Sequence, residues 1–202
     1  MTKKYREPNL VINKIYTRKG DSGNTFLVGG KKVSKDALRV VCYGEIDELI
    51  VLIGGVLTHI THLDNNDNFK KLYKKIDRIQ NELFNIGNML ATIDGDISEN
   101  MPQVDLNHIQ NLEDEIDIYN NKLPSLKSFV LPGGSQINIW FHLARTTCRR
   151  CERLVVKLSN KEQVDTIIVK YLNRLSDFLF TCSRWVNYEL SINETLWNPN
   201  KE

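Results

Sequence analysis

Hydrophobic residues recur three or four positions apart through most of the chain after residue 38, the spacing of a helix with one buried face. The cleanest run extends from Phe69 to Leu90, and the same spacing covers residues 40–60, 106–119, 136–160 and 165–190. The second helix is expected to end near Asp94, and Ser135 is expected to cap the fourth. Because no comparable strand run follows residue 38, the pattern predicts an all-α, five-helix bundle with up-down connections.

The two ends of the chain lack this pattern. Residues 1–38 mix glycine, lysine and β-branched residues without a helical period, which predicts a tail and a loop that fold against something else. A chain of 202 residues suits one well-buried core. We therefore expect a single domain over residues 1–202, with an N-terminal loop over 1–38, the bundle over 39–190 and a C-terminal tail over 191–202.

Composition excludes several classes of partner. The 27 basic and 25 acidic residues leave a net charge of +2, which is too weak to steer a polyanion, so no nucleic acid is expected. No apolar run reaches membrane-spanning length, and the first ten residues lack the apolar core of a signal peptide. The four cysteines fit reduced, buried thiols better than disulfides in a chain of this size. Together these features predict a cytoplasmic protein without a membrane partner.

A row of arginines is the most unusual feature of the predicted fourth helix. Arg145, Arg149 and Arg153 are spaced by four and share one face, and Glu152 lies three residues beyond Arg149. Like charges at this spacing destabilise a helix by a few tenths of a kcal/mol per pair. Either an anion such as phosphate offsets this repulsion, or the row is a solvated face bridged to carboxylates such as Asp114, Glu115 and Asp117.

The stretch IYTRKGDSGNT, residues 15–25, contains neither the GK[ST] ending of a phosphate loop nor G-x-G-x-x-G. Its hydroxyls, arginine and glycine backbone N–H groups could still surround phosphates, although such loops are more often flexible connectors. In YGEIDEL, Asp47 lies at the edge of the apolar stripe, where a carboxylate needs a partner, and an arginine from a facing helix is the obvious candidate. YLNRLSD places Asn173 and Asp177 on one face of the last helix.

Two other patterns are expected to carry no chemistry. Cys148 and Cys151 form a C-x-x-C, but no second C-x-x-C and no βαβ pattern accompany them, so core packing is favoured over a redox pair or half a zinc site. The four histidines lack carboxylates or cysteines at ligand spacing. No transition metal held by the protein itself is predicted.

Six blocks together resemble a known family. IYTRKGDSGNT, VSKDALRV, YGEIDEL, FVLPGGS, HLARTTCRRCER and YLNRLSD occur in the order and at the separations of the PduO-type ATP:cob(I)alamin adenosyltransferases, and the resemblance extends from about Lys14 to Asn187. The resemblance implies a ferritin-like five-helix bundle with an N-terminal nucleotide-binding loop. It also implies a homotrimer with active sites between subunits.

The resemblance assigns roles to individual residues. Those implied to bind ATP are Thr17, Arg18, Lys19, Gly20, Asn24, Thr25, Lys35, Arg149, Arg150, Glu152, Arg153 and Asn173. Asp47 would pair with Arg145, and both are implied, with Phe129 and Arg149, to serve the reaction itself. Phe129 matches the aromatic residue that fills the lower axial side of cobalt. The chain departs from the family pattern at Ser22, where lysine is commoner, at Ala37-Leu38, and at Cys151, where alanine is usual.

The implied reaction transfers the 5′-deoxyadenosyl group of ATP to the cobalt of cob(I)alamin, with Mg²⁺, and forms adenosylcobalamin and triphosphate. A reductase and a B12-dependent acceptor enzyme would be the protein partners. Two alternatives remain open at this point. A non-catalytic bundle that delivers or senses ATP or corrinoid would use the same residues, and a purely structural helical adaptor would leave the N-terminal loop unaffected by ATP.

Overall fold

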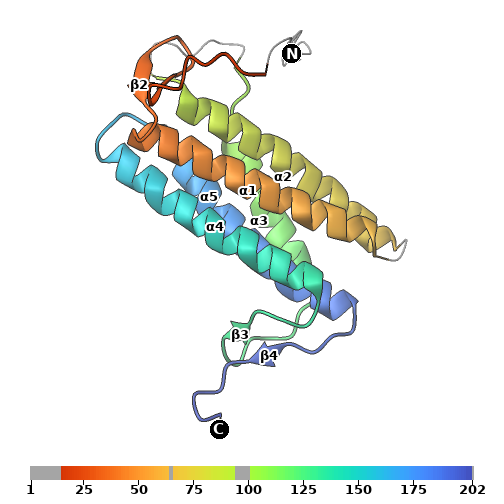
Figure 1. Cartoon of the computed structure of the whole chain (residues 1–202). Coiled ribbons are helices and arrows are strands. Elements are labelled where there is room, and N and C mark those ends of the chain that lie inside the picture. The colour runs from red at the N-terminus through yellow and green to blue at the C-terminus, as the bar shows by residue number, and fades with distance from the viewer. Residues whose placement is uncertain (1–14, 64–65, 94–100, 202) are drawn as a thin grey trace.

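The computed structural model describes residues 15–63, 66–93 and 101–201, and this part of the chain contains five long helices (Figure 1). They are α1 (Leu38–Thr61), α2 (Asp67–Ala91), α3 (Leu106–Asn120), α4 (Gln136–Ser159) and α5 (Thr166–Glu189). The predicted all-α bundle is confirmed. Ser135 caps α4 as expected, because its side chain accepts a hydrogen bond from the backbone N–H of Asn138. The predicted end of the second helix at Asp94 lies outside the described residues, and α2 ends at Ala91.

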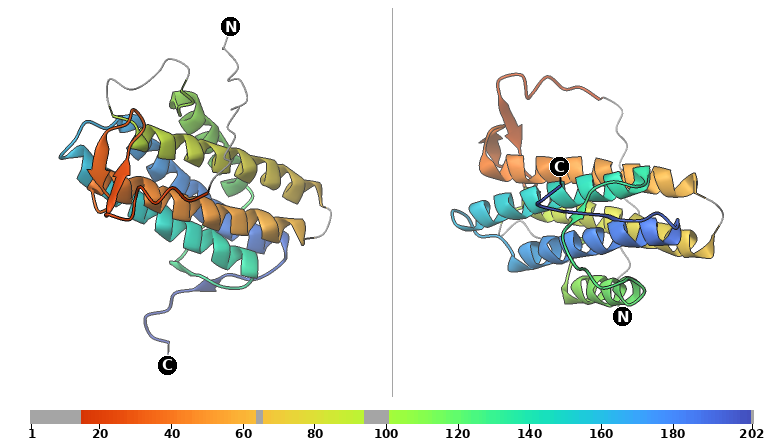
Figure 2. Two further views of the ribbon diagram at one scale, coloured as in Figure 1. Left: turned by 45° about the horizontal axis from the view of Figure 1, so that its top comes forward. Right: turned by 90° about the horizontal axis from the view of Figure 1, so that it is seen from below.

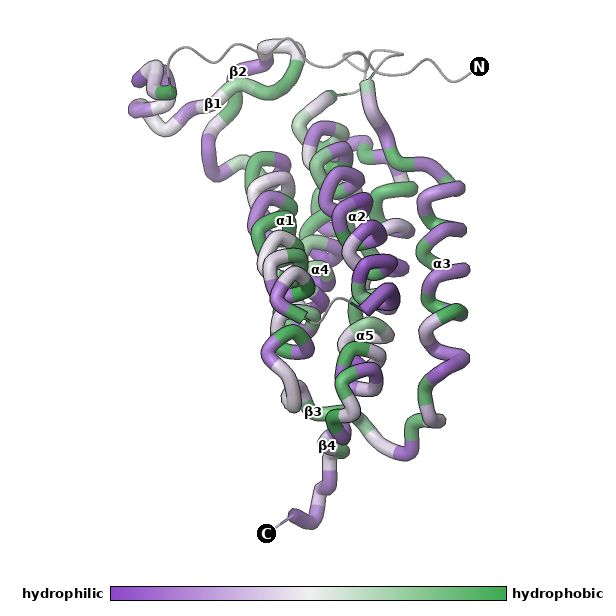
Figure 3. The backbone as a smooth tube through the Cα atoms, turned by 90° about the vertical axis from the view of Figure 1, so that its right-hand side faces the viewer, coloured by the Kyte–Doolittle hydropathy of each residue, from purple (hydrophilic) through white to green (hydrophobic). Residues whose placement is uncertain are grey.

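The helices pack in a defined order around one apolar core. α1 packs against both α2 and α4, α4 packs against α5, and α3 packs on the outer side of α5 (Figures 1 and 2). Each helix carries both hydrophobic and hydrophilic residues along its length, as a helix with one buried side must (Figure 3). Gly55 lets α1 approach α4 closely, because a Cβ at this position would lie 2.5 Å from the Trp140 ring.

Two small antiparallel sheets lie at opposite ends of the bundle, which the sequence pattern did not indicate (Figure 1). β1 (Asn24–Phe26) pairs with β2 (Lys32–Ser34) near the start of α1. β3 (Val130–Leu131) pairs with β4 (Thr195–Leu196), so the predicted C-terminal tail returns to the segment that precedes α4. Strands of two or three residues are too short to show alternation, which explains why they were missed.

Arg39, only 4% exposed, fastens the end of the bundle next to the β1–β2 hairpin. Its guanidinium donates to the carboxylate of Glu162 at 2.8 Å and to the backbone carbonyls of Leu90, Thr92 and Gln163 at 2.8, 3.1 and 3.1 Å. A buried guanidinium is tolerated only when its donors are satisfied. This one joins the first turn of α1 to the end of α2 and to the loop between α4 and α5.

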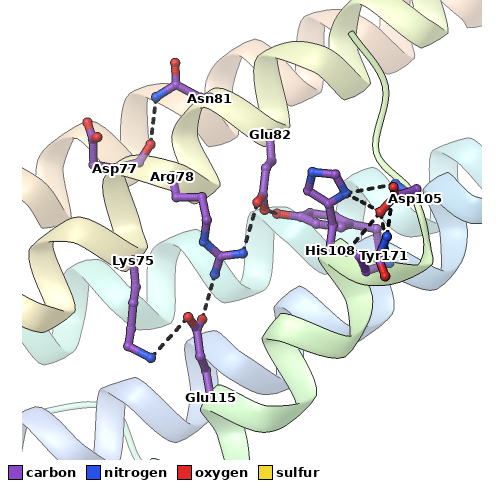
Figure 4. Close-up of polar contacts among 10 residues, drawn as sticks. Lys75, Asp77, Arg78, Asn81, Glu82, Asp105, His108, Glu115 and Tyr171 are labelled. Carbon is purple, nitrogen blue, oxygen red and sulfur yellow. Dashed lines mark hydrogen bonds and ion pairs between the residues drawn. The ribbon is translucent and has the colours of Figure 1, made fainter. Parts of the chain in front are cut away.

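A buried carboxylate connects α2, α3 and α5 on the other side of the bundle (Figure 4). Glu82 accepts from the Tyr171 hydroxyl at 2.5 Å and from Arg78 at 3.0 Å, and Arg78 also contacts Glu115 at 2.7 Å. Lys75 completes the group through its 3.1 Å contact with Glu115. The network satisfies the polar atoms that α2 places in the core, and it fixes the position of α3.

Tyr171→Phe is expected to lower the free energy of unfolding by about 1–3 kcal/mol, because it removes a donor from a buried carboxylate without changing the packing volume much. Urea denaturation followed by circular dichroism measures this change. Tyr73→Phe is the matched control on an exposed side of α2, and it should stay within about 0.5 kcal/mol of the wild type. Equal losses in the two variants would contradict the assigned role of the hydroxyl.

Candidate functional site

Within the part of the chain that the structure describes, the arginine row on α4 has no carboxylate partner. Among the described residues, none of the ion pairs involves Arg145, Arg149 or Arg153, and Arg149 and Arg153 are exposed. The arginines that do pair with carboxylates are Arg39, Arg78, Arg150, Arg174 and Arg184. Of the described arginines, three of the four that lack a carboxylate partner therefore lie on one side of α4, where they repel each other unless an anion binds.

The solvated-face alternative requires the arginines to pair with carboxylates on α3, but two of these carboxylates bind other residues. Glu115 contacts Lys75 and Arg78, and Asp114 accepts from Gln110 at 2.9 Å. α3 packs on α5 and does not cover α4. Among the described residues, no ion pair joins the row to Asp114, Glu115 or Asp117, so the partners that this alternative requires are not found there.

Glu152 and Asn173 meet beside the arginine row. Asn173 Nδ2, on α5, donates to Glu152 Oε1 at 3.0 Å. Both lie within the predicted ATP-binding set, so the structure brings together residues that are distant in the sequence. Glu152 is the sole carboxylate on α4, and it lies three residues after Arg149 and one before Arg153.

Arg145 lies deeper than the other two members of the row. Its guanidinium sits 5.9 Å from the centre of the Phe180 ring, and its Nε donates to His142 Nδ1 at 3.4 Å. Burial lowers the pKa of Arg145 from its usual value, and the charge of Arg149 lowers it further. His142 and Phe180 were not predicted from the sequence; an aromatic residue and a histidine on apolar helix faces look like ordinary core residues.

His142 is buried and neutral at physiological pH. Burial lowers its pKa to about 4, the charge of Arg145 lowers it further, and Glu194 opposes the shift. Since Arg145 Nε can only donate, Nδ1 accepts, and the ring proton resides on Nε2. In the described part of the chain, Nε2 is buried without a hydrogen-bond partner.

The unfolded state therefore binds more protons than the native state between pH 6.5 and about 4, and the native state loses stability as the pH falls through this window. The contribution of His142 is at most about 3 kcal/mol. In the His142→Asn variant, the free energy of unfolding should fall less steeply over this range than in the wild type. Urea titrations at several pH values measure both slopes, and identical slopes would contradict the prediction.

The N-terminal loop forms a compact cationic turn. Lys35 donates its backbone N–H to the Gly23 carbonyl at 2.9 Å, and a Cβ at Gly20 would lie 3.0 Å from Lys35 Nζ, so glycine lets the ammonium lie over the turn. Arg18 has a φ of 60° and lies over the Tyr16 ring. Thr17 and Lys19 are exposed, and Asn24 and Thr25 are half-buried in β1. The predicted loop residues therefore do gather in one place.

The departures from the family pattern have modest local effects. Ser22 Oγ is 3.4 Å from Asn24 Nδ2, at the long end of a hydrogen bond. Ala37 is the N-cap of α1 and supplies no side-chain bond there.

Within one chain, the loop and the arginine row remain apart. In the described ranges, no hydrogen bond or ion pair joins residues 15–36 to α4 or α5, and the hairpin meets the helices through a bond from Val28 N to the Ala91 carbonyl at 3.0 Å. The hairpin lies at the end of the bundle where α1 begins (Figure 1). A single chain therefore presents two separate halves of the predicted nucleotide site.

Two residues of the predicted site are placed differently from the expectation. Arg150 contacts Glu45 at 2.6 Å and Glu48 at 2.7 Å, so it joins α4 to α1 and points away from the rest of the row. Asp47 is exposed rather than at the edge of the core, because one residue past buried Ile46 the helix has already turned outward. Its predicted contact with Arg145 does not occur within the described part of one chain. There, Arg150 of α4 pairs instead with Glu45 and Glu48, which flank Asp47 on α1.

Phe129 projects from a loop that is firmly held. Ser135 Oγ donates to Asn187 Oδ1 at 2.7 Å, and Asn187 Nδ2 donates to the Gly133 carbonyl at 2.9 Å. The backbone N–H of Gly133 donates in turn to Asn138 at 3.0 Å. The Phe129 side chain is 79% exposed on this rigid support, and an exposed aromatic ring held in this way is typical of a surface that a ligand covers.

The C-x-x-C pattern is confirmed as core packing. All four cysteines are free and buried. Cys148 Sγ donates to the Leu172 carbonyl and Cys151 Sγ to the Glu45 carbonyl, each at 3.2 Å. Burial raises the pKa of the Cys151 thiol to about 12, which keeps it protonated and unreactive.

Comparisons with known proteins agree on one family. Residues 15–186 match the model of the family described as Cobalamin adenosyltransferase. The Corrinoid adenosyltransferase of Bacillus subtilis is 41% identical over 181 residues, which cover 90% of each chain, and that of Homo sapiens is 34% identical over 192 residues, covering 94% of this chain and 75% of the human protein. A variant PduO-type ATP:corrinoid adenosyltransferase from Lactobacillus reuteri, solved with cobalamin and ATP, superposes with a TM-score of 0.84 at 35% identity and covers 93% of this chain and 98% of its own.

Proposed function

The chain belongs to the cobalamin adenosyltransferase family, and on this premise we propose that it transfers the 5′-deoxyadenosyl group of ATP to the cobalt of cob(I)alamin. The products are adenosylcobalamin and triphosphate. The observation that carries the proposal is the row of Arg145, Arg149 and Arg153, which lacks carboxylate partners although five other described arginines are paired. Guanidinium groups bind phosphate oxygens through charge-assisted forked contacts.

ATP binding would use both halves of the site. Arg149, Arg153, Glu152 and Asn173 would hold the nucleotide from α4 and α5. Thr17, Arg18, Lys19, Gly20, Asn24, Thr25 and Lys35 would wrap the triphosphate with the cationic turn. Arg150 is left out of this set, because its guanidinium is already engaged by Glu45 and Glu48.

Assembly into a homotrimer would bring the two halves together. The hairpin of one subunit would then cover the α4–α5 face of its neighbour, and exposed Asp47 would reach Arg145 across the boundary. Support comes from the separation of the halves within one chain, and from the unpaired state of both Asp47 and Arg145 among the described ion pairs. Analytical ultracentrifugation measures the assembly state directly.

Mg²⁺ fits the donor set of this site. Glu152 provides a carboxylate oxygen beside the arginines, and Mg²⁺ prefers oxygen ligands shared between one or two carboxylates and substrate phosphates. The ion would neutralise charge on the triphosphate as that group departs.

The chemistry requires placement and charge neutralisation, with no general base. The cobalt electron pair forms the bond to C5′ of the ribose while the C5′–O bond breaks and its electrons leave with triphosphate. Displacement at this carbon needs an in-line arrangement, which residues on two rigid helices can provide. The arginine row would stabilise the negative charge that develops on the leaving group.

Phe129 would act on the corrinoid side. Cobalt is harder to reduce to Co(I) while a lower axial ligand donates electron density to it. A large apolar ring on that side excludes both the ligand and water, which favours the reduced state. The exposed ring on its braced loop suits this role.

The test is an adenosylation assay. Cob(II)alamin, ATP, Mg²⁺ and a strong reductant should yield adenosylcobalamin, followed by its absorbance, together with one triphosphate per product. A binding protein that only delivers or senses the ligands would bind ATP and corrinoid without producing triphosphate.

We also propose a cell compartment and protein partners for the enzyme. Four free, buried cysteines suit a reducing compartment, and we assign the protein to the cytoplasm. Among the described helices, none combines the length and apolarity needed to span a membrane. A reductase that delivers one electron to cob(II)alamin and a B12-dependent enzyme that receives the product would be its functional partners.

A further inference from the structure

The segment after α5 is built into the fold at the end of the bundle that carries Phe129. Arg184, 4% exposed, donates to both carboxylate oxygens of Glu194 at 2.9 and 3.1 Å and to the Pro124 carbonyl at 2.9 Å. Ile192 N donates to the Asn187 carbonyl at 2.8 Å, which fixes the turn out of α5. The C-terminal residues are therefore anchored to the core of the same helix that braces the Phe129 loop.

From this anchor, the Trp197 backbone forms hydrogen bonds with Phe129 and with the residue before it. The β3–β4 pairing continues as a bond from Trp197 N to the Phe129 carbonyl at 2.7 Å, and Ser128 Oγ donates to the Trp197 carbonyl at 2.8 Å. Two short strands alone would be a marginal structure. The added bonds attach Ser128 and Phe129 to Trp197.

The two side chains also meet as rings. The Phe129 and Trp197 centroids are 6.3 Å apart with an interplanar angle of 66°, an edge-to-face arrangement. In the described part of the chain, this is the one aromatic contact of Phe129. Trp197 is itself 49% exposed, so the pair forms an uncovered apolar edge at the end of the bundle.

We propose that Trp197 is a positioning residue of the corrinoid site, and that it acts by holding the Phe129 ring at the height needed to exclude the lower axial ligand of cobalt. The inference rests on the function proposed above. A ring that shields cobalt must occupy one conformation, and Phe129, nearly fully exposed, has few other neighbours to restrict it. The Trp197 indole contacts the Phe129 ring in an edge-to-face arrangement. The bonds between the Trp197 backbone and both the Ser128 hydroxyl and the Phe129 carbonyl hold the segment that carries the ring.

The test is a double-mutant cycle. Trp197→Ala should lower kcat for cob(II)alamin-dependent adenosylation about tenfold and leave the KM for ATP within about twofold, since only the corrinoid side is disturbed. Trp197→Phe should recover most of the activity by restoring the edge-to-face contact. In a Phe129→Ala background, Trp197→Ala should add little, because the residue through which it acts is gone.

A second readout separates positioning from folding. The fraction of cob(II)alamin that loses its lower ligand in the presence of ATP, read from the absorbance spectrum, should drop in Trp197→Ala and recover in Trp197→Phe. Leu196→Ala is the matched control, because Leu196 is the exposed residue next to Trp197 at the end of β4 and has no aromatic ring to contact Phe129. Thermal melting of each variant checks that the fold is retained.

The outcomes are distinguishable. Wild-type activity in Trp197→Ala, or fully additive losses in the double variant, would overturn the role of Trp197 and leave the adenosyltransferase assignment intact. A wild-type protein that forms no adenosylcobalamin would overturn the proposed function, and with it this inference.

Discussion

Replacing Arg149 by alanine raises the KM for ATP by about ten- to a hundredfold, because one charge-assisted contact to phosphate contributes about 1.5–3 kcal/mol. The side chain is exposed and lacks a carboxylate partner among the described residues, so its removal leaves no buried charge behind. The loss therefore reports ligand binding rather than stability. Steady-state kinetics with varied ATP at saturating corrinoid, supported by calorimetric titration of ATP, measure the effect.

Arg150→Ala is the matched control for this prediction. It removes the same side chain from the adjacent position, but one that contacts Glu45 and Glu48 on α1. The control should retain a KM for ATP close to that of the wild type and lose some thermal stability. An unchanged KM in Arg149→Ala, or an equal rise in both variants, would remove Arg149 from the phosphate site.

The second large effect is expected at Phe129. Phe129→Ala lowers the rate of corrinoid adenosylation by about tenfold or more, equivalent to at least about 1.4 kcal/mol in the barrier. The reason is that water or the lower axial ligand regains access to cobalt once the ring is gone. ATP binding should be nearly intact, because Phe129 lies on the loop before α4 and the arginine row lies within the helix.

Leu126→Ala is the control for Phe129, because it removes another exposed apolar side chain from the same loop. Adenosylation kinetics and calorimetric titration with ATP are measured for both variants. Parallel losses of ATP affinity and of turnover in Phe129→Ala would contradict its assignment to the corrinoid side.

The helical part of the fold was predictable because its signal is local. Buried residues such as Leu72, Ile76 and Ile79 follow the helical period closely, and the cap at Ser135 is a single-residue signal. The arginine row and the link from Glu152 to Asn173 were also accessible, since spacing along a helix fixes which side chains share a face.

Other features depend on contacts between residues far apart in the sequence, and they leave no recognisable pattern in the local sequence. The pairing of Val130 with Leu196 joins segments far apart in the sequence, so the residues after α5 look like an unstructured tail. The burial of Arg39 and Glu82 depends on partners from other helices. Spacing also could not separate Arg149, which has no carboxylate partner among the described residues, from Arg150, which has two.

The narrow attachment of the β1–β2 hairpin has a consequence for nucleotide affinity. Leu27 is buried, and within the described residues the hairpin is joined to the helices by a backbone hydrogen bond from Val28 N to the Ala91 carbonyl. A unit held this lightly opens at a free energy well below that of global unfolding, so its amide hydrogens should exchange with solvent sooner than those of α1. The free energy needed to hold the hairpin closed is then subtracted from the free energy that ATP binding releases. Substitutions that merely stiffen this segment would tighten ATP binding without touching the nucleotide.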